Sequence, residues 1–462
     1  MNDLTRTDTT HLANPTLNSP VEQLTSAQGL DLTTLEPVRT PVQSWETEAG
    51  TRVLFVPSRE LPIVDLVLDF KAGRALEGET PGLAALVLYL LDEGTQTLDA
   101  NLFAERLDEL GALIDKRVRP EHVTLNLRSL SDHDVLAPAV ELLTDMVAHP
   151  AFHPSAVARV KQQLLAHQAA QETGATTRAR NEAFRHLFAG HPYAHALNGS
   201  QDGVNAITPD QLRAFHQRAY SANNLQVSLV GDLSRQQAEA LVEGLTQALP
   251  QHWAAADTPA VPAAEPEIIH IEQPGTSDRV LLAMPFQMQP DAPDYLALVL
   301  ASEILGTGLE SRLMRELRQR RGLTYDVRAQ LVSLSAAGVL AIEWEIAAHY
   351  NAAAQDLVAD IVRQFVEQGP SAAELALARQ QLAGALLRAV ARNHSLAGLL
   401  GDLGRQGLPA DHVSSYVERL ANLTEQDIKR ALQCLELQAM VFVSVGPDAS
   451  QQPLPEQPVT DQ

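Results

Sequence analysis

Short sequence repeats recur at nearly one spacing along this chain, and they limit its fold more than any other feature. The sequence Lys161–Leu164 is echoed by Arg379–Leu382. The sequence Ala85–Leu88 recurs unchanged as Ala297–Leu300, at almost the same separation along the chain. Because the expected strands and helices follow in the same order around both copies, the repeats predict two homologous domains.

The apolar periodicity predicts both strands and helices in each half. In the first half, we expect strands at 51–57, 63–70, 122–130 and 225–233, with helices at 80–91, 100–110, 133–149, 154–172 and 209–220. In the second half, we expect strands at 268–272, 280–285, 325–334, 339–346 and 439–445, with a helix at 295–305 and two long helices before the last strand. This order predicts an α+β fold, in which each domain has a mostly antiparallel β-sheet packed with helices.

The length of 462 residues fits two domains of about 200 residues better than one core. The segment before the second set of strands is rich in Ala and Pro and lacks helical periodicity, which is typical of a linker. We predict a disordered N-terminal tail (1–40), an N-terminal domain (41–247), a linker (248–266), a C-terminal domain (267–450) and a C-terminal tail (451–462).

Composition excludes several classes of function. The net charge of −23 argues against binding to nucleic acid or to an anionic membrane surface. No apolar run approaches the roughly 18 residues that span a bilayer. Residues 1–36 are polar and contain no hydrophobic signal region. We therefore expect no membrane span and no signal peptide, which favours the cytoplasm by default and leaves the periplasm open.

The stretch from Ser311 to Val327 carries the most distinctive pattern. It reads as a basic helix capped by Ser311, a stop at Gly322 and a strand that opens at Tyr325. Arg318 leaves the last turn of this helix, shortly before Tyr325. Such a corner can aim a guanidinium and a phenol into one cleft. Taken alone, Arg318 is better explained as a solvated cation near a helix C-terminus, where cations suit the helix dipole.

This stretch resembles the Ser-Arg-Leu…Leu-Arg…Gly-Leu-x-Tyr signature of the insulinase-like zinc peptidases, also called pitrilysin-like peptidases or inverzincins. The resemblance extends over about residues 42–448. In that family the Arg and Tyr come from a metal-free domain or subunit and hold the substrate backbone across from the zinc. The resemblance therefore implies that Arg318 and Tyr325 bind substrate.

The zinc motif of that family is degenerate in this chain. The family places His-x-x-Glu-His on its first core helix, after Gly-Leu-Ala. Here Gly82–Ala84 sets the register, so the ligand positions become Ala85 and Tyr89 and the general-base position becomes Leu88. Alanine and leucine have no donor atoms for zinc. The third family ligand is a Glu on a later helix, yet residues 146–171 contain no carboxylate. We expect this chain to bind no metal and no other cofactor.

Three neighbouring histidines invite another metal site. They are His186, His191 and His195, and Pro192 interrupts the run, so no single helix can present all three. The loop also resembles the His-Pro-Tyr landmark of the family, which is structural. We predict that these histidines are not metal ligands.

By resemblance, some family members are heterodimers in which one subunit has the zinc motif and the other has the Arg/Tyr pair. The sequence favours the second kind: a non-catalytic, substrate-binding subunit, inactive alone, that acts on extended peptides with a zinc-bearing insulinase-like partner. The alternative is a structural subunit of the same fold, as in the core proteins of respiratory complexes. A stand-alone enzyme would need zinc at Ala85 and Tyr89, which disfavours it.

Overall fold

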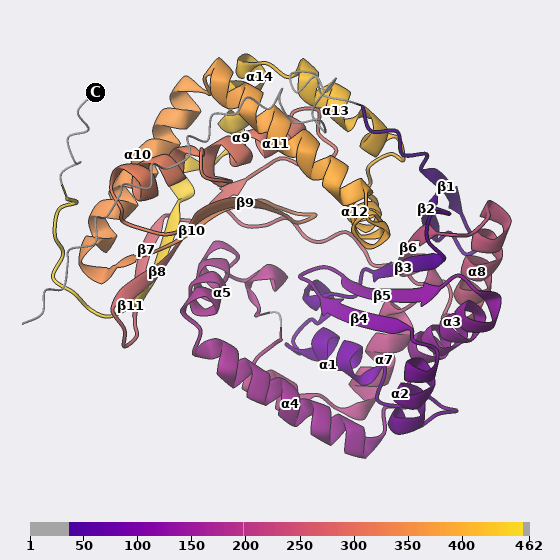
Figure 1. Cartoon of the computed structure of the whole chain (residues 1–462). Coiled ribbons are helices and arrows are strands. Elements are labelled where there is room, and N and C mark those ends of the chain that lie inside the picture. Colours follow the sequence, from indigo (N-terminus) through magenta and orange to yellow (C-terminus); the bar gives the residue numbers. More distant parts are fainter. Residues whose placement is uncertain (1–36, 197, 456–462) are drawn as a thin grey trace, which may run out of the picture. The chain divides into compact units, whose positions relative to one another are not determined.

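The strands of the first half form one sheet (Figure 1). The computed structural model describes residues 37–196 and 198–455, and within them this sheet has the order β1-β2-β6-β3-β5-β4. Strands β2 and β6 run parallel, and the other neighbouring pairs are antiparallel. The strands are β1 (Gln43–Glu46), β2 (Arg52–Pro57), β3 (Ile63–Phe70), β4 (Leu113–Val118), β5 (Val123–Leu130) and β6 (Leu225–Gly231).

The second half repeats this topology. Its sheet has the order β7-β11-β8-β10-β9, with β7 and β11 parallel and the other pairs antiparallel. The strands are β7 (Glu267–Glu272), β8 (Ser277–Phe286), β9 (Val327–Ser333), β10 (Gly338–Ala347) and β11 (Val441–Gly446). The predicted α+β fold of two homologous halves, each with a mostly antiparallel sheet, is confirmed.

The helices repeat with the sheets. Helices α3, α4 and α5 begin at His133, Pro154 and Ala175, and α10, α11 and α12 begin at Asn351, Ala372 and Asn393, so one constant interval separates the members of each pair. The helices of the first half are α1 (Leu83–Leu90), α2 (Ala100–Glu109), α3 (His133–Ala148), α4 (Pro154–Glu172), α5 (Ala175–Leu187), α6 (Gln201–Ala206), α7 (Pro209–Ala219) and α8 (Arg235–Ala248). Those of the second half are α9 (Tyr295–Gly306), η6 (Met314–Arg320), α10 (Asn351–Gln368), α11 (Ala372–Val390), α12 (Asn393–Arg405), α13 (His412–Asn422) and α14 (Glu425–Ala431). No described helix combines the length and apolar character needed to cross a membrane.

One helix from each half packs against the sheet of the other half. Helix α5 packs on β8 and β11, where Ala183 and Phe184 join a buried cluster with Leu281 and Val443. Its counterpart α12 packs on β2, β3 and β6 of the first sheet. The exchange is symmetric, because α5 and α12 occupy equivalent places in the repeat. It explains why the central strands, such as β3 and β6, are buried along almost their whole length: helices cover both of their faces.

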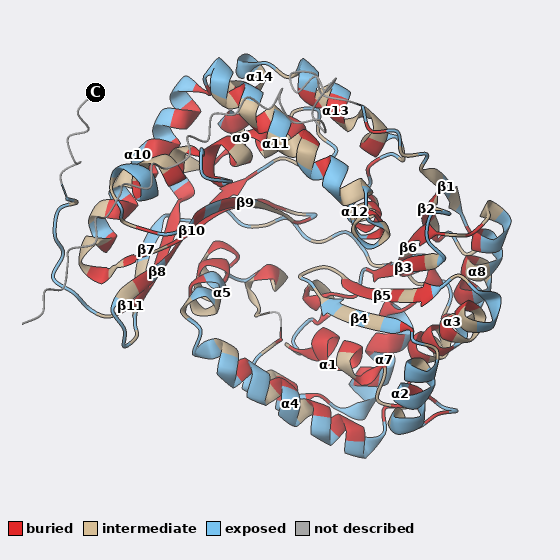
Figure 2. Cartoon of the chain, viewed as in Figure 1, coloured by how far each residue is buried: buried red, intermediate tan, exposed pale blue. Residues whose placement is uncertain are grey.

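Burial follows the position of each strand in its sheet (Figure 2). Val53, Leu54 and Phe55 are consecutive in β2 and all are buried. Edge strand β4, in contrast, alternates between exposed and half-buried residues. The apolar pattern of the sequence therefore reports which strands lie between layers.

The predicted domain limits (41–247 and 267–450) stay a prediction, and the exchange of α5 and α12 means that no single cut separates the two halves. Residues 249–266, in the predicted linker, form neither helix nor strand in the described structure. The linker is held in place by His186 and His191, whose Nε2 atoms lie 3.1 Å and 3.0 Å from the carbonyl oxygens of Glu265 and Pro259. The predicted tails fall mostly outside the described residues, at 1–36 and 456–462.

Candidate functional site

The helix that carries Arg318 is a π-helix over Met314–Arg320. The sequence predicts an ordinary helix here. In a π-helix each amide bonds five residues back instead of four, and such turns are rare and frequent at functional sites. The hydroxyl of Ser311 accepts a hydrogen bond from the amide of Met314 at 3.4 Å, so the capping role expected of Ser311 is present.

One face of this helix is buried and the other is open. Leu313, Met314 and Leu317 lie in the core, with exposed fractions of 3% or less. Arg318 follows Leu317 and is exposed. Among the described residues, the side chain of Arg318 forms neither a hydrogen bond nor an ion pair. Its guanidinium is therefore available to a ligand.

Tyr325 lies in a bend ahead of β9, so the predicted strand opening at Tyr325 is wrong. Strand β9 begins at Val327, because β10 pairs with it no further than Trp344 opposite Val327. The hydroxyl of Thr324 donates to the carbonyl of Asp326 at 2.9 Å and closes the bend. The side chain of Tyr325 is 90% exposed, and its hydroxyl has no partner among the described residues.

A partly buried ion cluster joins the start of the π-helix to α11, and the sequence interpretation missed it. Glu374, in the first turn of α11, accepts hydrogen bonds from Arg312 Nε and Arg315 Nη2 at 2.8 and 2.9 Å. Burial by itself raises the pKa of Glu374, but the hydrogen bonds from Arg312 and the Ser371 amide lower it to about 2. The pattern Ser371-x-x-Glu374 does mark a capping box in the sequence, yet it gives no sign of the distant arginines.

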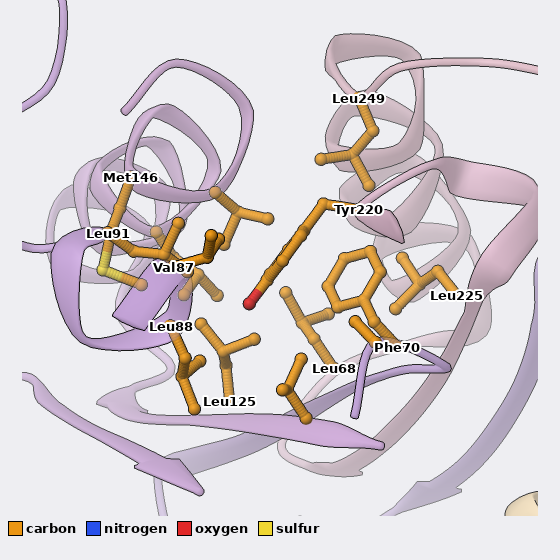
Figure 3. Packing of buried hydrophobic residues seen from close by; sticks show 14 of the residues in the cluster. Leu68, Phe70, Val87, Leu88, Leu91, Leu125, Met146, Tyr220, Leu225 and Leu249 are labelled. Atoms are coloured by element: carbon orange, nitrogen blue, oxygen red, sulfur yellow. The ribbon is translucent and has the colours of Figure 1, made fainter. Parts of the chain in front are cut away.

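The predicted position of the family's zinc motif is part of the hydrophobic core (Figure 3). Ala85 and Leu88 lie on α1 and are fully buried. Leu88 faces a cluster that includes Leu68, Leu125 and Met146. Tyr89 is half-buried, and burial together with the nearby charge of Asp115 raises its pKa. Zinc does not fit these residues, because apolar side chains fill the space and supply no donor atoms.

A buried carboxylate beside α1 has a structural role. The carboxylate of Glu77, near α1, accepts hydrogen bonds from the amides of Gly82 and Ala84, both at 2.9 Å, so it caps the helix. Burial raises the pKa of Glu77 to about 7, although these amides oppose the rise. Within the described residues, no three His, Cys, Asp or Glu side chains converge in a way that could hold a metal ion.

Comparison with known proteins agrees with this architecture. The family pattern described as "Insulinase (Peptidase family M16)" matches residues 52–199, and the one described as "Peptidase M16 inactive domain" matches residues 206–382. A crystal structure of a peptidase M16 inactive domain from Pseudomonas fluorescens is 36% identical, with a TM-score of 0.86, and the alignment covers 90% of this chain and 100% of that one. The chain belongs to the peptidase M16 family.

Curated M16 relatives are more distant. The non-peptidase homolog YmxG of Helicobacter pylori is 25% identical over 409 residues, which cover 86% of this chain and 92% of that protein. An uncharacterized zinc protease of Mycobacterium bovis is 23% identical over 393 residues, which cover 82% of this chain and 87% of that protein. These matches support a non-catalytic M16-like protein, which agrees with the prediction that Ala85 and Leu88 stand at the places of a zinc ligand and the general base.

Proposed function

We propose that this M16 chain is the substrate-binding subunit of a heterodimeric zinc metallopeptidase that acts on extended peptides. One observation carries the proposal. Arg318 and Tyr325 project from a supported helix and bend with no partner among the described residues, whereas the zinc position is filled by core side chains. A tyrosine that is 90% exposed buries nothing in the described fold, so binding gives it a purpose that packing does not.

The chemistry of the pair suits an extended peptide. A guanidinium stays protonated and offers N–H donors in a planar fork, and a phenol offers one O–H donor. Backbone carbonyl oxygens of a peptide without secondary structure are free to accept both. Donors that face an oxygen on which negative charge develops are worth roughly 3–4 kcal/mol each. Arg318 and Tyr325 would thus hold the peptide and stabilise charge on the scissile carbonyl.

The partner in this proposal is a second M16 subunit that keeps the His-x-x-Glu-His motif and holds the zinc. The symmetric repeat is consistent with this division of labour, because each half has the same architecture and either half of a pair can carry a given function. In this division, Arg318 and Tyr325 of this chain bind the peptide. The zinc that activates water belongs to the partner, since Ala85 and Leu88 leave no ligands here.

A purely structural role is the alternative, and one experiment separates the two. The chain is purified alone and mixed with a zinc-bearing M16 protein, and cleavage of a fluorescein-labelled casein peptide is followed. We expect turnover only in the mixture, and about a hundredfold loss for Arg318→Ala and for Tyr325→Phe.

The matched control is Arg320→Ala, which removes an exposed arginine of the same helix that already pairs with Glu316. This variant should cleave like the wild type. A mixture whose turnover is indifferent to Arg318 and Tyr325, or a stable assembly without turnover, would instead favour the structural role.

A further inference from the structure

The carboxylate of Glu374 is saturated with donors from two directions. On one side, Arg312 donates from Nε to Oε1 and from Nη2 to Oε2, both at 2.8 Å, and Arg315 Nη2 donates to Oε1 at 2.9 Å. On the other side, the amide and hydroxyl of Ser371 donate to Oε2 at 2.8 and 2.9 Å. The side chain of Glu374 is 14% exposed, and its charge-assisted bonds to the two arginines are partly buried, whereas its bonds to Ser371 are exposed.

Arg312 extends this anchor to a third element. Its guanidinium carbon lies 4.3 Å from the centroid of the Phe365 ring on α10, and its Nη2 donates to the carbonyl of Gly369 at 2.9 Å. Arg312, just before the π-helix, therefore ties this segment to the end of α10 and the start of α11. The guanidinium of Arg312 donates hydrogen bonds to two different residues and also stacks on an aromatic ring, so it has little freedom to move.

Contacts at its two ends fix the π-helix (Met314–Arg320). A π-helix is uncommon, and the open face of this one, at Arg318, Gln319 and Arg320, is exposed. Its end is fixed by backbone bonds: the amide of Gly322 donates to the Arg318 carbonyl at 3.0 Å, and the amide of Leu323 donates to the Leu317 carbonyl at 2.8 Å. Within the described structure, the ion pairs that join this segment to another helix come from Arg312, just before the π-helix, and from Arg315 in its first turn.

We propose that Glu374 is a positioning residue for peptide binding: through Arg312 and Arg315 it fixes the π-helix, and so sets the direction of Arg318 and the place of Tyr325. The inference rests on the function proposed above for that pair. Glu374 itself does not touch the peptide.

The alternative is that Glu374 serves only as the cap of α11, and two variants distinguish these roles. Glu374→Gln keeps a side-chain acceptor for the Ser371 amide, since Gln also completes a capping box, but it removes the charge that binds both arginines. Arg315→Gln leaves the cap and the Arg312 contact intact and removes one link. The matched control is Glu316→Gln, which breaks an ion pair with Arg320 inside the same helix and does not reach α11.

The experiment measures two quantities for each variant in the mixture with a zinc-bearing M16 protein. The first is kcat/KM for the fluorescein-labelled casein peptide, which we expect to fall about ten- to hundredfold for Glu374→Gln, because small displacements of a positioning group have effects of this size. The second is hydrogen exchange, which should become roughly tenfold faster at residues 314–326 while the denaturation midpoint stays near that of the wild type. Arg315→Gln should show a smaller change of the same kind, and Glu316→Gln none.

The outcomes separate this inference from the proposed function. If Arg318→Ala lowers turnover but Glu374→Gln and Arg315→Gln do not, the pair binds peptide and the positioning role is wrong. If exchange at residues 314–326 is unchanged in Glu374→Gln, the anchor does not hold the helix and the inference is also overturned. If Arg318→Ala has no effect, the proposed function fails and the positioning role fails with it.

Discussion

Arg405, the last residue of α12, forms an ion pair with Asp69 in β3, 336 residues earlier in the chain. The side chain of Asp69 is 1% exposed and that of Arg405 is 12% exposed. The hydroxyl of Thr124 donates to Asp69 at 3.0 Å, and His122 Nδ1 lies 2.6 Å from the other carboxylate oxygen. Helix α12, which comes from the second half and packs on the first sheet, is therefore held there by a buried charge cluster as well as by apolar packing.

Removing one member of this cluster should destabilise the whole fold. We expect Arg405→Met to lower the free energy of unfolding by about 3–5 kcal/mol, because it removes a counter-charge from the buried carboxylate of Asp69. Urea denaturation measures the change. Arg363→Met is the control: its partner Asp360 lies one turn away on the surface, so the loss should stay within about 1 kcal/mol. Equal losses for the two variants would show that the cluster does not join the halves.

The stability of the first half should depend on pH through His216. This imidazole lies 2.7 Å from the Val147 carbonyl and stacks on the ring of Tyr220. Burial lowers its pKa from 6.5 to about 4, although the bond to Val147 opposes the shift. The folded state therefore holds the neutral form, and its stability is full above pH 6.5 and decreases as the pH falls toward 4.

The size of this decrease follows from the shift. Lowering the pKa of His216 from 6.5 to about 4 corresponds to a loss of roughly 3 kcal/mol in the free energy of unfolding between pH 6.5 and pH 4. His216→Phe keeps a ring against Tyr220 but cannot ionise, so its unfolding free energy should change less over the same pH range. Urea denaturation of both proteins across that range tests the prediction. Parallel curves for the wild type and the variant would rule out His216 as the source.

Local periodicity anticipates much of the fold. The predicted helix at 154–172 matches α4, and the spacing of the sequence repeats reappears in three pairs of helices. The exchange of α5 and α12 could not be predicted, because α5 is a polar segment whose burial depends on strands far along the chain, in the second half. Amphipathic pattern reports that a face is buried, but it does not name the sheet that buries it.

The candidate site, like the fold, could be predicted from the sequence only in part. Arg318 and Tyr325 follow from the motif, and the exposure of both side chains is what the structure adds. The strand limit at Tyr325 was missed because an aromatic residue before Asp326 and Val327 fits a strand pattern, whereas the true limit is set by where β10 stops pairing. Glu374 was missed because an ion pair with Arg312 across 62 residues leaves no local signature.

Leu88, at the predicted position of the zinc motif, should be important for the stability of the fold. Leu88 is fully buried, so Leu88→Ala should lower the free energy of unfolding by about 2–5 kcal/mol, and Leu88→Glu by more, because it buries a carboxylate without a partner. The control is Leu387→Ala on α11, where the side chain is 46% exposed and the loss should stay within about 1 kcal/mol. Denaturation curves measure all three. A stable Leu88→Glu variant would mean that the position still tolerates the family's glutamate.

Substitutions of Arg318 and Tyr325, in contrast, should leave the stability of the fold almost unchanged. Because Arg318 and Tyr325 are exposed and have no partners among the described residues, Arg318→Ala and Tyr325→Phe should change the unfolding free energy by no more than about 0.5 kcal/mol. Tyr193→Phe is the matched control for the loss of a phenol oxygen. The hydroxyl of Tyr193 donates to Glu121 at 2.6 Å inside the fold, so its removal should destabilise the protein by about 1–3 kcal/mol. If Tyr325→Phe were as destabilising as Tyr193→Phe, the exposed hydroxyl would have a structural partner and would not be free for a peptide.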